Sequence, residues 1–243
     1  MSIIDVPRII AHRGASGHAP ENTAAAIRKA HELGATWVEF DCMLSKDGRV
    51  FLNHDETLER TAGVSHKACD LELADLMHLD VGSWFNADYA GETIPSFRNV
   101  MSLLSELGMG ANVEIKPCKG FEKATGAAVA KEIDSHWPAD IPPPVVSSFS
   151  KESLIAAIPL LGPEVEVAQL WGRVPAEWRQ ELAELGATAV HCNAFRLEKE
   201  IAGQIAASGT PLRCYTVNEA PLAEKLFGWG VNCIITDYPD MFL

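Results

Sequence analysis

The chain has 243 residues, of which 47% are hydrophobic and 22% are charged, and its formal net charge is −13. This length and apolar content suit one large domain with a sizeable core, which excludes extensive disorder. The acidic charge argues against binding to nucleic acid or to anionic membranes, because both need a dense basic patch. An anionic small molecule would have to be met by a local group of cations.

The cysteines and the N-terminus indicate the cellular compartment. The six cysteines form neither a close Cys-x-x-Cys pair nor a zinc-ligand spacing, which predicts free, buried thiols. The first residues, MSIIDVPRII, lack a basic region followed by a long apolar segment, and no stretch approaches the roughly 18 apolar residues of a membrane span. We therefore expect a cytoplasmic protein without stable membrane association.

The chain begins with a strand, a loop and a helix. Residues 8–11 form the first predicted strand, which leads to His12, Arg13 and a loop rich in glycine, alanine and serine. Residues 20–23 (PENT) then supply capping side chains for a helix predicted over residues 22–33. His12 and Arg13 are thus expected at the carboxyl end of the first strand.

The next strands also carry polar groups at their ends. In residues 37–41 (WVEFD) apolar and acidic residues alternate, so Glu39 and Asp41 share one face of the strand. A tight turn follows, and residues 49–53 read as another strand that ends at His54.

Residues 56–93 interrupt this regular pattern. Their periodicity is weak, and glycines break them into short apolar pieces. So short a segment rarely buries a core of its own. We therefore expect an insertion within a single domain over residues 1–243.

Strands and helices alternate in the rest of the chain. In the strand predicted over residues 112–115, the spacing points Glu114 and Lys116 the same way. The later predicted strands cover residues 145–146, 165–170, 187–192, 212–217 and 231–236. About eight strands alternating with helices favour an α/β fold, a closed (β/α)8 TIM barrel with a small insertion after the second barrel strand. An open doubly wound sheet is the alternative, but no Gly-x-Gly-x-x-Gly turn follows the first strand.

Seven polar residues fall at the predicted ends of early strands, where barrel enzymes build their active sites. They are His12, Arg13, Glu39, Asp41, His54, Glu114 and Lys116. With neutral histidines this set carries one more negative than positive charge, so a divalent cation would make it attractive to a phosphodiester. Carboxylate oxygens favour Mg²⁺ or Ca²⁺ as that cation. The fork of Arg13 and the point charge of Lys116 suit phosphate, and the two histidines suit general acid and base catalysis.

Seven short motifs make the pattern recognisable. They are HRG (12–14), PENT (20–23), EFD (39–41), HD (54–55), GSWF (82–85), EIK (114–116) and ITDYPD (235–240). In order and spacing they resemble the glycerophosphodiester phosphodiesterase family, and in particular its short cytoplasmic bacterial members. One departure is Tyr215, which stands where many members carry tryptophan.

The resemblance implies a TIM barrel that hydrolyses deacylated phospholipids, such as glycerophosphocholine or glycerophosphoethanolamine, to sn-glycerol 3-phosphate and an alcohol. It also implies one divalent cation, Mg²⁺ or Ca²⁺. The implied roles are a metal site at Glu39, Asp41 and Glu114, acid and base catalysis by His12 and His54, and phosphate binding by Arg13 and Lys116.

Three further residues at later strand ends, Phe149, His191 and Tyr215, are weaker candidates for substrate contact. Two rival functions stay open, a phospholipase D-like enzyme acting on intact lipids and a barrel that binds glycerophosphodiesters without hydrolysing them. The sequence also leaves open which histidine is the acid, whether the glycerol 2-hydroxyl or water attacks phosphorus, and whether the protein is a monomer or a homodimer.

Overall fold

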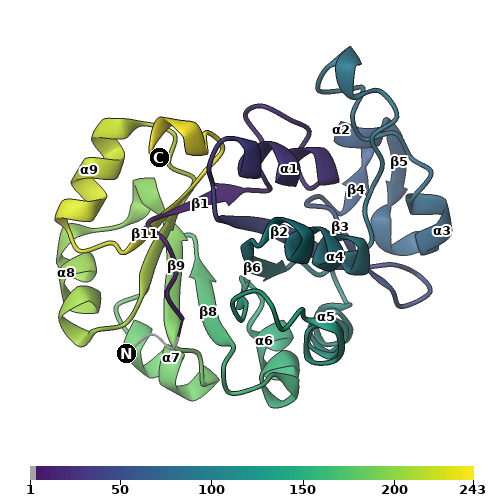
Figure 1. Ribbon diagram of the computed structural model, residues 1–243. Coiled ribbons are helices and arrows are strands. Elements are labelled where there is room, and N and C mark those ends of the chain that lie inside the picture. Colours follow the sequence, from purple (N-terminus) through teal and green to yellow (C-terminus); the bar gives the residue numbers. More distant parts are fainter. Residues whose placement is uncertain (1–3) are drawn as a thin grey trace.

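Eight parallel strands close into a barrel in the computed structural model, which describes residues 4–243 (Figure 1). They are β1 (Ile9–His12), β2 (Trp37–Leu44), β6 (Gly110–Ile115), β7 (Val145–Ser148), β8 (Glu166–Trp171), β9 (Ala189–Asn193), β10 (Leu212–Tyr215) and β11 (Cys233–Thr236). The sheet closes because β1 pairs in parallel with both β11 and β2. The predicted TIM barrel is confirmed, and the open sheet is excluded.

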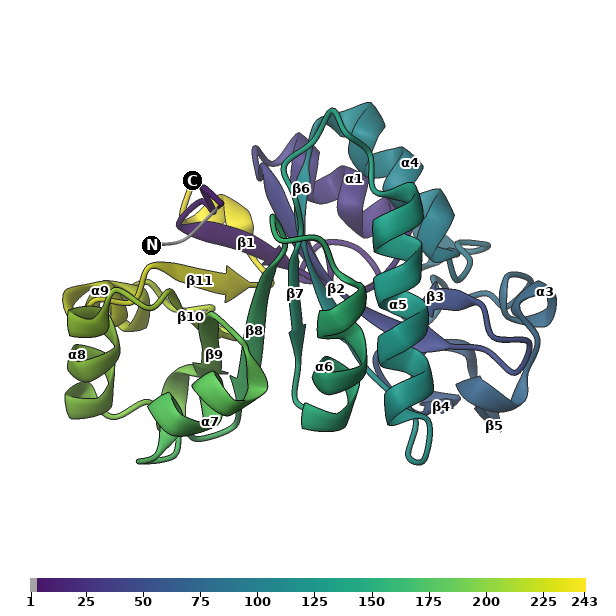
Figure 2. The ribbon, with the colours of Figure 1, turned by 90° about the horizontal axis from the view of Figure 1, so that it is seen from below.

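Helices between the strands cover the outside of the barrel (Figure 2). They are α1 (Ala24–Glu32), α4 (Phe97–Leu107), α5 (Glu122–His136), α6 (Lys151–Ala157), α7 (Trp178–Leu185), α8 (Lys199–Ser208) and α9 (Ala220–Gly228). The chain begins α1 as the PENT motif predicts, since the Thr23 hydroxyl accepts a hydrogen bond from the Ala26 amide. Short 3₁₀ turns follow α6 (η3, Ile158–Leu160), β9 (η4, Ala194–Arg196) and β11 (η5, Pro239–Met241).

Side chains of β2 alternate between two environments. Phe40 packs outward into the main apolar core between the barrel and its helices, whereas Trp37 belongs to a smaller cluster inside the barrel. Glu39 and Asp41 have the same parity as Trp37 and therefore project to the inside. The alternation read from the sequence thus brings two carboxylates into the barrel.

Residues 49–53 contain the strand β3 (Val50–Leu52), but this strand runs antiparallel to β2 instead of continuing the parallel alternation. The turn between them is tight, with Gly48 in the left-handed region at φ 74°. The hairpin returns the chain to the level of Asp41, where the Asn53 amide donates to the Asp41 carbonyl. His54 therefore reaches the rim by this return and not at the end of a parallel strand.

The segment between β3 and α4 protrudes from one side of the barrel (Figure 1). It contains β4 (Thr57–Leu58), α2 (Glu59–Ala62), β5 (Val64–Lys67), η1 (Ala68–Asp70), α3 (Leu73–Leu76) and η2 (Ala87–Tyr89). Its apolar residues form a buried cluster that includes Met43 of β2 and Phe51 of β3. The segment is therefore packed onto the hairpin that leads to His54.

Two predictions from composition can be compared with the structure. All six cysteines are free and buried, as expected. None of the helices within residues 4–243 is long and apolar enough to cross a membrane.

Candidate active site

A cavity of about 420 Å³ opens at the carboxyl ends of the barrel strands. Six of the seven predicted residues line it, namely His12, Arg13, Glu39, His54, Glu114 and Lys116. The seventh, Asp41, is buried and pairs in register with Glu114 on the neighbouring strand β6. The structure therefore brings the whole predicted set together, although His54 arrives by a route that the sequence did not predict.

Glu39, Asp41 and Glu114 form a buried acidic cluster, and one oxygen from each lies within 4.8 Å of the others. Burial, followed by the neighbouring carboxylates, raises the pKa of Glu39 well above its usual range and that of Glu114 to about 7. Burial also opposes ionisation of Asp41, but Arg13 and Lys116 outweigh it and lower the pKa of Asp41. Such a cluster is stable when protons or a cation offset the repulsion.

The donor set of this cluster fits a hard divalent cation. Glu39 Oε1 is buried and has no hydrogen-bond partner among the described residues. An unpartnered carboxylate oxygen inside a protein is costly unless a cation or a proton meets it. Three carboxylates without a thiol or imidazole ligand are the oxygen-rich type of site that Mg²⁺ and Ca²⁺ prefer. The acidic triad can therefore hold a metal ion.

Two cations flank the acidic cluster. The Arg13 amide donates to Glu39 Oε2 at 2.9 Å, and its Nε lies 3.2 Å from Asp41 Oδ2. Arg13 reaches both because its backbone turns into the left-handed region, at φ 52°. Lys116 Nζ donates to Glu114 Oε1 at 3.1 Å and lies 3.7 Å from Asp41 Oδ1.

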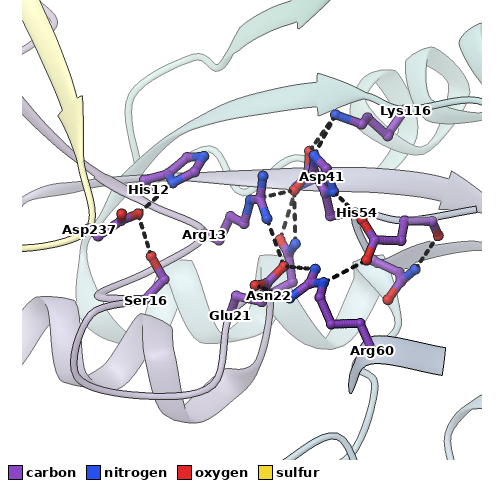
Figure 3. Close-up of polar contacts among 12 residues, drawn as sticks. His12, Arg13, Ser16, Glu21, Asn22, Asp41, His54, Arg60, Lys116 and Asp237 are labelled. Atoms are coloured by element: carbon purple, nitrogen blue, oxygen red, sulfur yellow. Dashed lines mark hydrogen bonds and ion pairs between the residues drawn. The ribbon is translucent and has the colours of Figure 1, made fainter. Parts of the chain in front are cut away.

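Each of the two candidate catalytic histidines is paired with an aspartate, and Figure 3 shows the pair of His12 and Asp237. His12 Nδ1 lies 2.6 Å from Asp237 Oδ1, and His54 Nδ1 lies 2.6 Å from Asp55 Oδ1. A carboxylate at Nδ1 fixes the tautomer and leaves Nε2 to exchange protons. Nε2 of His54 lies 2.9 Å from Lys116 Nζ. Burial, then Arg13 and Lys116, lowers the pKa of His54 although Asp41 acts to raise it.

Asp237 and Asn22 contact residues of the predicted set, and neither was predicted as a site residue. In the sequence Asp237 belongs to the ITDYPD motif, and its position directly after the last strand is a rim position. Asn22 belongs to the predicted helix start, but its side chain donates to Asp41 Oδ2 at 2.9 Å and accepts from the Asp41 amide at 3.0 Å. Polar residues next to a strand end were the available signal in both cases.

The three weaker candidates lie in different places. Phe149 and Tyr215 line the cavity, with their rings 5.8 Å apart in an edge-to-face arrangement. His191 is fully buried and is not among the residues that line the cavity; its Nε2 lies 3.1 Å from Arg213 Nη1. The exposed ring of Phe195, which was not predicted, contributes to the aromatic side of the cavity.

Comparison with known proteins identifies the family. A model of the glycerophosphoryl diester phosphodiesterase family matches residues 12–241. The chain belongs to this family. Its resemblance to the family, and with it the assignment to the phosphodiester hydrolases, is therefore confirmed.

Known members of this family match nearly the whole chain. The glycerophosphodiester phosphodiesterase of Caldanaerobacter subterraneus is 32% identical, covering 97% of this chain and 96% of the relative. That of Bacillus subtilis is also 32% identical, covering 96% of this chain and 84% of the relative. Among solved structures, an Oleispira antarctica phosphodiesterase in complex with the product sn-glycerol 3-phosphate has a TM-score of 0.93 and 37% identity, covering 97% and 95% of the two chains.

Proposed function

We propose that this chain hydrolyses glycerophosphodiesters to sn-glycerol 3-phosphate and an alcohol, with His12 and His54 exchanging the protons. One observation carries the assignment of roles. Two histidines, each oriented by a carboxylate, line one cavity. In Figure 3 they lie on either side of Arg13 and the buried Asp41. The product bound by the Oleispira antarctica relative supports the choice of substrate.

The phosphate would be held by the two cations. The planar fork of Arg13 can donate to two phosphate oxygens, and Lys116 can supply a point charge to a third. Both cations already compensate buried carboxylates, since Arg13 contacts Asp41 and Lys116 contacts Glu114. The phosphodiester would therefore lie in the cavity that Arg13 and Lys116 line, next to the acidic cluster.

Proton transfer is assigned to Nε2 of each imidazole, the nitrogen that does not contact an aspartate. One histidine accepts at Nε2 the proton of the attacking hydroxyl, either the glycerol 2-hydroxyl or water, as the new bond to phosphorus forms. The other donates a proton from Nε2 to the alcohol oxygen as the old bond breaks. Asp237 and Asp55 would stabilise the imidazolium in each case, since each accepts a hydrogen bond at Nδ1.

We assign one Mg²⁺ or Ca²⁺ ion to Glu39, Asp41 and Glu114. When bound, such an ion polarises a phosphoryl oxygen and offsets developing negative charge. The unpartnered Glu39 Oε1 and the mutual proximity of the three carboxylates support this assignment.

The alcohol group would face the aromatic side of the cavity. Phe149 and Tyr215 offer ring surfaces there, and Phe149 already lies 5.6 Å from the ammonium group of Lys116. Aromatic faces attract quaternary ammonium groups by cation–π interaction. This chemistry suits the choline of glycerophosphocholine.

We further propose that residues 1–243 act as one cytoplasmic domain, as a monomer or a homodimer.

Release of sn-glycerol 3-phosphate from glycerophosphocholine, measured with and without EDTA, tests this function. We expect activity that EDTA abolishes and that Mg²⁺ or Ca²⁺ restores. Glu39→Gln should lose about 10- to 100-fold or more in activity through metal loss. Glu106→Gln, which alters an exposed carboxylate paired with Arg28, is the matched control and should leave activity unchanged.

Other outcomes would point to the rival functions. Activity that survives both chelation and Glu39→Gln would exclude the metal assignment. Hydrolysis of intact phosphatidylcholine but not of glycerophosphocholine would indicate a lipid-directed enzyme, and binding without product release would indicate a binding protein. A cyclic glycerophosphate released in a single turnover would identify the 2-hydroxyl as nucleophile, and hydrolysis of a 2-deoxy substrate would exclude that route.

A further inference from the structure

Arg60, on α2 of the protruding segment, contacts two carboxylates that serve different parts of the site. Figure 3 shows its contact with Glu21. Its Nε donates to Asp55 Oδ2 at 2.7 Å. Its Nη1 and Nη2 donate to Glu21 Oε2 and Oε1 at 2.7 and 2.8 Å. Arg60 does not line the cavity. Arg60 therefore acts at one remove, because its partners Asp55 and Glu21 contact His54 and Arg13, which do line the cavity.

The contact with Asp55 leads to His54. The two oxygens of the Asp55 carboxylate are divided between Nδ1 of His54 and Nε of Arg60. Asp55 is one-third exposed, so without Arg60 its carboxylate could rotate toward water. The imidazole of His54 would then lose the partner that fixes its orientation.

The contact with Glu21 leads to Arg13. Glu21 Oε1 accepts from Arg13 Nη1 at 2.7 Å as well as from Arg60 Nη2. The Glu21 side chain is only 12% exposed, so two guanidinium groups share one nearly buried carboxylate. Their contacts lower the pKa of Glu21 although burial acts to raise it. Arg60 thus keeps Glu21 in place beneath the proposed phosphate-binding side chain.

We propose that Arg60 is a positioning residue that fixes His54 and Arg13 relative to each other through Asp55 and Glu21. This inference rests on the proposed function. It gives the protruding segment a role in the reaction, because Arg60 lies on α2 of that segment and contacts both carboxylates. A lysine could not replace Arg60, since three N–H donors in one plane are needed for the two carboxylates.

Arg60→Ala and Arg60→Lys test the inference, with Arg98→Ala as the matched control. Arg98 makes two hydrogen bonds to Glu132 on the outer helices and is 49% exposed, against 42% for Arg60. Steady-state kinetics with glycerophosphocholine and thermal unfolding are measured for each protein. Arg60→Ala should lower kcat by about 10- to 100-fold, as for other residues that orient a site, and should raise KM. Arg98→Ala should stay within about twofold of the wild type.

Rescue separates positioning from a purely structural role. Guanidinium ion at millimolar concentration should restore part of the activity of Arg60→Ala and should leave Arg98→Ala unchanged. Arg60→Lys keeps the charge, so it should fold with an unchanged melting temperature and still lose activity because it lacks the fork.

Several results would overturn the inference. One is that the wild type hydrolyses glycerophosphocholine and that Arg60→Ala keeps the same activity. Another is full activity of Arg60→Lys, or a loss in Arg60→Ala that guanidinium does not reverse. If Arg60→Ala does not fold, Arg60→Lys decides the matter. Inactivity of the wild type itself would instead contradict the proposed function.

Discussion

The two histidines of the site face one cavity, but different regions of the molecule hold them. Asp237, the partner of His12, follows β11, and its carboxylate also accepts from Ser16 Oγ and from Asn218 Nδ2, each at 2.7 Å. Asp55, the partner of His54, is its neighbour in the chain and is held by Arg60 of the protruding segment. The barrel supports one pair, and the segment outside it supports the other.

This difference has a physical basis in how each pair is fixed. His12 ends β1 and Asp237 directly follows β11, and the register of these adjacent strands is set by pairs such as Ala11 with Thr236. Barrel closure therefore fixes their separation. Burial acts to raise the pKa of Asp237, but its hydrogen bonds, that from His12 first, lower it to about 2. The position of His54 depends on a hairpin and on ion pairs at the protein surface, which are easier to displace.

The largest effects should come from the histidines themselves. His12→Ala and His54→Ala should each lower kcat on glycerophosphocholine by about 10²- to 10⁴-fold, the usual contribution of a general acid or base. A substrate with a 4-nitrophenol leaving group needs no protonation of the departing oxygen. One of the two variants should therefore recover activity on that substrate, and this variant identifies the general acid.

His18→Ala provides the control for both histidine variants. His18 also lies in the loop after β1 and contacts Asp240 at 2.8 Å, but it does not line the cavity. We expect it to leave kcat within about twofold of the wild type, as for other surface contacts. Equal recovery of both variants on the nitrophenyl substrate would contradict separate acid and base roles.

The aspartate partners should give smaller and unequal effects. Asp237→Asn should reduce kcat by about 100-fold and Asp55→Asn by about 10-fold, the range for residues that orient a functional group. Both oxygens of Asp237 accept hydrogen bonds from donors. In either orientation of the asparagine side chain, the NH₂ group of Asp237→Asn would face one of these donors, which should also cost about 1–3 kcal/mol in the free energy of unfolding. Denaturant unfolding and kinetics of both variants check this. Equal losses would show that the protruding segment holds His54 as firmly as the barrel holds His12.

The sequence predicted which side chains meet better than it predicted what supports them. Alternation in β2 and β6 is a local property, so it was enough to place Glu39, Asp41 and Glu114 inside the barrel. The contact between His12 and Asp237 joins residues 225 positions apart, and only closure of the barrel brings them together. No pattern in the sequence indicated that Arg60 supports the site, because its partners Asp55 and Glu21 lie in two separate loops.

His191 shows a second limit of reasoning from alternation. A period of two predicts the face on which a side chain lies but not its depth in the barrel. Asn193, two residues later on β9, lines the cavity, whereas His191 lies opposite Arg213 and is fully buried. The register between strands decides this depth, and register cannot be read from one strand.

The smallest expected effect concerns His191. This histidine lies beside the cation Arg213, whereas His12 and His54 each lie beside a carboxylate. Burial first, and then Arg213, lowers its pKa well below the usual value. The unfolded chain therefore binds the proton more readily than the folded one. Stabilisation from neutral His191 is complete above about pH 6.5 and is lost as the pH falls toward the lowered pKa, at up to about 1.4 kcal/mol per pH unit.

His191→Gln should remove this part of the pH dependence and leave kcat unchanged. A glutamine oxygen can still accept the hydrogen bond that Arg213 Nη1 donates to His191 Nε2. Denaturant unfolding of both proteins between about pH 7.5 and pH 5 measures the slope, with exposed His66→Gln as the control. An unchanged slope in His191→Gln would mean that His191 titrates alike in the folded and unfolded chains. A large loss of kcat in His191→Gln would mean that this buried histidine helps to position the residues that line the cavity.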